Sequence, residues 1–191
     1  MKKIILGFLA VALSFTGARA DLIPSFEGTA PGDVGTLWNY SVSVTVEQNA
    51  NTGDYFTIYD FGNIIPASNT QPAGWTLTTS FLGVTPAQII PPDDPSVLNL
   101  TWTYSGPTIF GTSPAGQDIG PFQVEVAGQQ TQTKNSFFAA QGTLAEGPEA
   151  GSKVGNVGLI VVPVPEPSAI ALMVGAAALG LLGRAFSRRR S

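Results

Sequence analysis

Residues 40–47 read Tyr-Ser-Val-Ser-Val-Thr-Val-Glu, and this stretch decides the fold class. Polar side chains alternate there with four apolar ones: Tyr40, Val42, Val44 and Val46. A period of two is typical of a strand with one buried face, because successive side chains of a strand point to opposite sides of the sheet.

Similar stretches follow along the chain. They comprise residues 55–61, 75–81, 98–104, 122–126, 136–144 and 157–162. Because residues 40–47 and 55–61 flank a turn, we predict that they form a hairpin. Residues 21–38 contain several glycines and prolines, which predicts an irregular segment with one short strand. No helical period is found within residues 21–160, so seven to nine strands predict an all-β, antiparallel β-sandwich, Ig-like or jelly-roll-like.

Charge is distributed unevenly. Residues 21–164 contain twelve acidic side chains and two basic ones, Lys134 and Lys153, for a net charge of −10. Such a surface repels phosphate backbones, so we expect no nucleic-acid partner.

The chain contains neither histidine nor cysteine. Disulfides and nucleophile pairs built on histidine are therefore excluded, and we predict that the protein is not an enzyme. A hydrolase built on carboxylates alone is an alternative. Asp93 and Asp94 are adjacent in a proline-rich loop, however, and a glycosidase needs carboxyl groups that converge across a cleft.

Residues 47–54 offer weak calcium candidates, which are Asn49, Asn51 and Asp54. An EF-hand loop requires glycine at its sixth position and glutamate at its twelfth. Counted from Glu47, Gly53 is seventh and Ile58 is twelfth. Asn and Asp are also ordinary turn residues, so the pattern favours a turn. We therefore predict no cofactor, with calcium as a weak alternative.

Tryptophans raise the alternative of a sugar-binding platform. Trp75 and Trp102 are in phase with apolar neighbours, which favours the core, whereas the pattern leaves Trp38 undecided. Asn-x-Ser/Thr glycosylation patterns begin at Asn39 and Asn99, both within predicted strands.

The N-terminus has the pattern of a secretory signal. Lys2 and Lys3 precede an apolar run that ends in Ala18-Arg19-Ala20. Signal peptidase requires small residues at the two positions that Ala18 and Ala20 occupy. We therefore predict a signal peptide over residues 1–20 that forms a signal helix.

The C-terminus combines three features in order. Val-Pro-Glu-Pro-Ser occupies residues 164–168, an apolar run covers residues 169–183, and arginines follow. The basic end includes Arg184, Arg188, Arg189 and Arg190. We predict a transmembrane helix over about residues 169–186, with the arginines stopping transfer on the cytoplasmic side. A helix over residues 168–183 would be about 24 Å long, against about 30 Å for the hydrocarbon core, so it is short for a permanent anchor.

This tail resembles the PEP-CTERM sorting tail of exported proteins in Gram-negative bacteria. The resemblance implies recognition by an exosortase, a membrane-embedded transpeptidase, through Pro165, Glu166 and Pro167. It also implies cutting near these residues and release to the cell surface or the extracellular polysaccharide matrix. The expected organisation is a signal peptide (1–20), an ectodomain (21–162) and a sorting tail (163–191), whose motif is 165–167 and whose basic end is 184–190.

The sequence therefore predicts an exported, non-enzymatic surface or matrix protein with a structural or adhesive role. Its expected partners are signal peptidase and exosortase during export, the membrane through the C-terminal helix, and exopolysaccharide. Two alternatives remain: a carbohydrate-binding module, with or without calcium, and a protein anchored permanently by its C-terminal helix.

Overall fold

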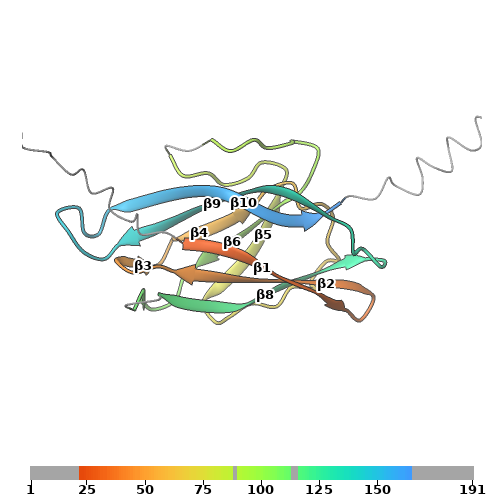
Figure 1. The fold of residues 1–191 in the computed structure, drawn as a ribbon, viewed down its shortest axis with the longest axis horizontal. Coiled ribbons are helices and arrows are strands. Elements are labelled where there is room, and N and C mark those ends of the chain that lie inside the picture. The colour runs from red at the N-terminus through yellow and green to blue at the C-terminus, as the bar shows by residue number, and fades with distance from the viewer. Residues whose placement is uncertain (1–21, 88–89, 113–115, 165–191) are drawn as a thin grey trace, which may run out of the picture.

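The structure is a computed structural model that describes residues 22–87, 90–112 and 116–164. These ranges are all-β and contain no helix (Figure 1), and accordingly no helix there could cross a membrane. In chain order the strands are β1 (Leu22–Pro31), β2 (Gly35–Val44), β3 (Gln48–Ala50), β4 (Tyr55–Ile58), β5 (Trp75–Ser80), β6 (Asn99–Tyr104), β7 (Ile109–Phe110), β8 (Gln117–Ala127), β9 (Thr133–Leu144) and β10 (Lys153–Pro163).

The strands form two antiparallel sheets. The smaller sheet has the order β1-β2-β8. In the larger sheet β5, β6, β4 and β9 are consecutive neighbours, β3 and β7 continue beside the end of β9, and β10 pairs with the other edge of β9. Figure 1 shows β1, β2 and β8 along one side of the domain and the long β9–β10 hairpin along the other. The predicted all-β class and antiparallel pairing are confirmed, and the arrangement is consistent with a β-sandwich.

Phe122 of β8 joins the two sheets. Its ring centroid lies 5.0 Å from that of Phe56 in β4 and 5.2 Å from that of Trp75 in β5, both in edge-to-face geometry. Trp102 of β6 stacks on Phe56 at 5.0 Å. Such arrangements are favoured because the electron-rich face of one ring meets the electron-poor edge of another, or the rings are offset. All four side chains are buried, so they form the centre of the core.

Residues 84–86, in the proline-rich loop between β5 and β6, cover part of the outer face of the larger sheet. The carbonyl oxygen of Val84 accepts hydrogen bonds from Thr57 Oγ1 (2.9 Å) and Tyr59 Oη (2.8 Å). Pro86 packs so closely on Gly155 of β10 that a Cβ at that glycine would lie 2.4 Å from Pro86 Cβ. These residues therefore help to bury the hydroxyl groups of Thr57 in β4 and of Tyr59 just after it.

The prediction of an irregular segment at residues 21–38 is wrong, because β1 is ten residues long. Among the described strands β1 pairs only with β2, so Pro24 is at a sheet edge where a missing N–H donor is tolerated. The register shifts between Phe26 and Gly28, and Gly28 adopts a φ of 120°. Glycine has no Cβ and therefore accommodates this bulge. The glycine and proline residues of this segment thus belong to an edge strand.

The predicted hairpin between residues 40–47 and 55–61 is also wrong. β2 lies between β1 and β8 in the smaller sheet, whereas β4 lies between β6 and β9 in the larger one. All four residues of β4 are buried, as expected for a strand covered on both faces. The turn that follows β2 therefore leads from one sheet to the other.

Candidate functional site

Asp54 is the centre of a buried polar cluster. Its side chain is fully buried, and its Oδ2 accepts hydrogen bonds from the backbone N–H of Asn51 and from Thr143 Oγ1, both at 2.8 Å. Its Oδ1 lies 2.5 Å from Lys153 Nζ, which also donates to Thr143 Oγ1 at 2.8 Å. The cluster connects the turn before β4 with β9 and β10.

This geometry bears on the calcium candidates. The ammonium of Lys153 supplies the positive charge beside Asp54, in the place where a cation ligated by that carboxylate would lie. Asn49 Oδ1 and Asn51 Oδ1 are buried and accept no hydrogen bond from the described residues. Among those residues no group of three or more acidic, histidine or cysteine side chains is arranged to hold a metal. Residues 51–54 thus form a turn that is closed by the ion pair between Asp54 and Lys153.

Asp93 and Asp94 have different partners from each other. Asp93 Oδ2 accepts a hydrogen bond from the Gly83 N–H and its Oδ1 accepts one from Asn99 Nδ2, both at 2.9 Å. Asp94 Oδ1 accepts from the hydroxyl and the N–H of Ser96, and these bonds lower the pKa of the Asp94 carboxyl. Both carboxylates therefore order the loop, and they do not converge on a common point.

Glu125 has a role that the alternating pattern of β8 does not reveal. Its side chain is 7% exposed, and Oε1 accepts hydrogen bonds from the N–H groups of Val34 and Gly35. A Cβ at Gly32 would lie 2.3 Å from the same oxygen. The carboxylate therefore holds the β1–β2 turn closed through its backbone donors.

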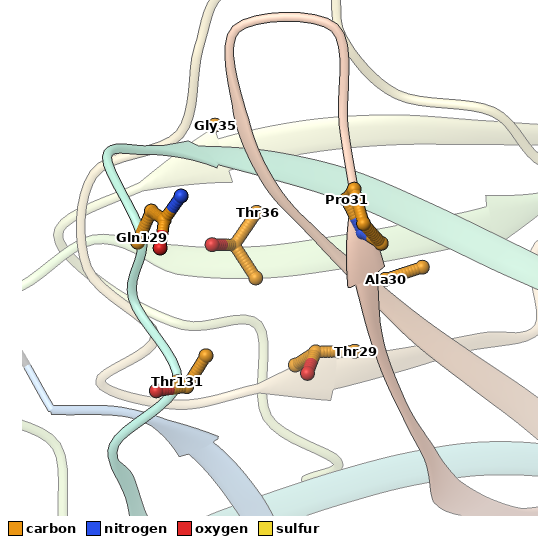
Figure 2. Close-up of a pocket in the computed structure, with 7 residues that line it drawn as sticks. All are labelled: Thr29, Ala30, Pro31, Gly35, Thr36, Gln129 and Thr131. Carbon is orange, nitrogen blue, oxygen red and sulfur yellow. The ribbon is translucent and has the colours of Figure 1, made fainter.

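A shallow cavity of about 220 Å³ lies beside this turn, at one end of the smaller sheet. Figure 2 shows its lining, which consists of Thr29, Ala30, Pro31, Gly35, Thr36, Gln129 and Thr131. The Thr36 hydroxyl is engaged with the Gly128 carbonyl oxygen at 2.9 Å. The lining offers hydroxyl and amide groups but no charged or aromatic side chain, so it suits hydrogen bonding to a small neutral group.

The three tryptophans are unavailable as an exposed sugar platform. Trp38 and Trp102 are fully buried and Trp75 is 4% exposed, which confirms the core prediction for Trp75 and Trp102 and assigns Trp38 to the core as well. Burial raises the pKa of Tyr55 to about 12 and that of Tyr40 well above its ordinary value. These side chains serve packing and remain neutral at ordinary pH.

The two glycosylation patterns differ in accessibility. Asn99 is 1% exposed and its Nδ2 is bonded to Asp93, so the folded domain does not present it. Asn39 is half-buried, and its Oδ1 accepts a hydrogen bond from Gln123 Nε2.

Several predicted residues lie outside the described part of the chain. They are the signal-cleavage residues Ala18 and Ala20, the sorting residues Pro165, Glu166 and Pro167, and the basic residues Arg184, Arg188, Arg189 and Arg190. The predicted signal helix and transmembrane helix lie outside it too. Comparisons with protein-family models, curated proteins and solved structures find no match to this chain.

Proposed function

We propose that the protein is exported, is not an enzyme, and has a structural or adhesive role at the surface or in the exopolysaccharide matrix of a Gram-negative bacterium. In this proposal signal peptidase removes residues 1–20, and an exosortase recognises Pro165, Glu166 and Pro167. A helix over about residues 169–186 holds the chain in the inner membrane until then. The ectodomain is an Ig-like or jelly-roll-like sandwich that functions after release.

The observation that carries the proposal is the position of the Pro-Glu-Pro motif just after the last strand, β10. β10 ends at Pro163, and the N–H of Val164 donates to the Gln132 carbonyl oxygen at 3.0 Å. The Val164 carbonyl oxygen accepts from Gln130 Nε2 at 2.5 Å. Pro165 is the next residue, so the Pro-Glu-Pro motif directly follows a residue whose N–H and carbonyl groups are both bonded to the segment before β9. A cut in this motif would release the domain intact.

Substitution of the motif tests this proposal. We expect Glu166→Ala to leave the protein in the membrane fraction, whereas the wild type reaches the surface or the medium. Glu149→Ala is the matched control, since Glu149 is an exposed acid in the β9–β10 turn. Equal release of Glu166→Ala and wild type would contradict the role of the motif. Retention of the wild type in the membrane would favour a permanent anchor.

The cavity of Figure 2 supports carbohydrate binding as a second candidate function. Its hydroxyl and amide lining matches the chemistry of sugar hydroxyls, although it is small for an oligosaccharide. Calorimetry against the producing organism's own polysaccharide, with and without calcium, tests this candidate. Binding that Gln129→Ala abolishes would support it, and no binding under either condition would eliminate it.

A further inference from the structure

β10 is an edge strand without the usual protection. It pairs with β9 from Lys153 to Pro163 without a register shift, and no other strand pairs with it in the described part of the chain. Natural edge strands are normally protected by charges, prolines or bulges, which prevent pairing with another chain. Residues 154–162 contain no charged residue and no proline. The free edge of β10 is therefore open to a further strand around Val157 and Leu159, whereas the carbonyl oxygen of Val161 already accepts a hydrogen bond from Tyr40 Oη at 2.9 Å.

Apolar surface accompanies this edge. Val157 and Leu159 are 45% and 64% exposed, and they lie on the same face of β10 because they are two residues apart. A groove of about 330 Å³ runs between β10 and β1. Its lining includes Ile23, Phe26, Phe138, Leu159 and Ile160. Burial of this surface would stabilise a complex through the hydrophobic effect.

Charge favours a second copy of this acidic chain as the occupant. The only two bases of residues 21–164, Lys134 and Lys153, lie on β9 and β10, and neither strand contains an acid. Two domains of net charge −10 repel least where they meet through these strands. Lys153 is already paired with Asp54, so β10 offers little free charge for an anionic polymer.

We propose that β10 pairs antiparallel with β10 of a second copy, around a two-fold axis at Gly158. This register places Val157 opposite the partner copy's Leu159, on the part of the edge that the Tyr40 hydroxyl does not engage. The exposed apolar residues of each strand then cover one another on one face. The contact is isologous, because the same surface is used by both copies, and it closes as a dimer. Gly158 at the axis is already packed on Phe138, where a Cβ would lie 2.5 Å from the ring.

Disulfide trapping tests the register, and the absence of native cysteine makes the readout clean. Opposed residues of antiparallel strands have Cα atoms about 4.5–5.5 Å apart, which a disulfide can span. We expect an equimolar mixture of Val157→Cys and Leu159→Cys full chains, in detergent under mild oxidation, to give a covalent dimer with one chain of each kind. Each variant alone should give much less, and so should Val34→Cys, whose exposed residue lies in the β1–β2 turn. Equal cross-linking of either variant with itself would overturn the register.

A charged substitution tests the dimer itself. By sedimentation of the full chain, Leu159→Lys should weaken dimerisation at least about tenfold, because a lysine would be buried against an apolar strand. Val34→Lys, at a residue that is 73% exposed, should leave dimerisation unchanged. Circular dichroism should show both variants folded. A monomeric wild type at its highest soluble concentration, or a dimer insensitive to Leu159→Lys, would overturn the proposal.

Discussion

Lys153 and Asp54 form an ion pair, with 2.5 Å between Nζ and Oδ1, although they are 99 residues apart in the chain. The pair fastens the beginning of β10 to the turn before β4, with Thr143 of β9 bonded to both side chains. Asp54 is fully buried, whereas the Lys153 side chain is 41% exposed. The carboxylate therefore depends on its partners more than the ammonium does.

Removal of Lys153 and removal of Asp54 should lower the stability of the fold by different amounts. Lys153→Met should lower the free energy of unfolding by about 1–2 kcal/mol, between the values for surface and buried pairs. Asp54→Ala should cost about 3 kcal/mol, because it also leaves the Asn51 N–H and the Thr143 hydroxyl without their acceptor. Lys134→Met, which removes the other base, should change stability by less than about 0.5 kcal/mol. Denaturant unfolding measures all three, and a Lys153→Met variant as stable as wild type would show that the pair contributes nothing.

Loss of the Glu125 carboxylate should loosen the β1–β2 turn. Glu125→Ala leaves the N–H groups of Val34 and Gly35 without their acceptor, so we expect a loss of about 1–3 kcal/mol. In this variant the amides of the turn should also exchange hydrogen faster than in the wild type, and this increase should exceed that of the β2 amides. Glu146→Ala, at an exposed acid in the β9–β10 turn, is the control and should be neutral. Unchanged exchange at the turn would contradict this role.

Truncation of the buried Phe122 ring should lower the stability much more than truncation of an exposed aromatic ring. Phe122→Ala removes the contacts of this β8 side chain to three rings of the larger sheet and should cost about 3–5 kcal/mol. Phe110→Ala makes the same chemical change at a side chain that is 62% exposed, so it should cost less than about 1 kcal/mol. Similar losses at both sites, measured by thermal or denaturant unfolding, would be inconsistent with the face-to-face packing of the sheets.

Tyrosine ionisation should destabilise the fold in alkali. Burial raises the pKa of Tyr55 from 10.0 to about 12, and burial also raises the pKa of Tyr59 and Tyr40. A group whose pKa is raised in the folded state stabilises it below the unfolded pKa, and this contribution is lost as the pH rises through the folded pKa. Stability should therefore decline between about pH 10 and 12. Tyrosinate absorbance and unfolding curves measured together check this, and titration of every tyrosine near pH 10 without loss of stability would refute it.

Alternation in the sequence predicted the strands whose side chains face one core. β2 and β6 follow this rule, since their apolar residues are fixed by a local period of two. β1 was missed because Pro24 and Gly28 resemble loop residues, although an edge strand with a bulge accepts both. Sheet membership was also missed, because strand pairing is non-local and a turn does not reveal whether its two strands pair with each other.

The polar cluster was unpredictable for a related reason. Asp54 has the sequence context of a turn residue, and its partner Lys153 is 99 residues further along the chain. Glu125 occupies an alternate position of β8 that normally faces solvent, and only the return of the β1–β2 turn buries it. Long-range contacts decide the environment of both carboxylates.

The intact mass of the mature wild-type protein shows whether the C-terminal tail is removed. We predict a chain that begins at Asp21, ends near Pro165, Glu166 and Pro167, and lacks the C-terminal arginines. A mature, membrane-bound form that keeps Arg184 to Arg190 would contradict release through the tail.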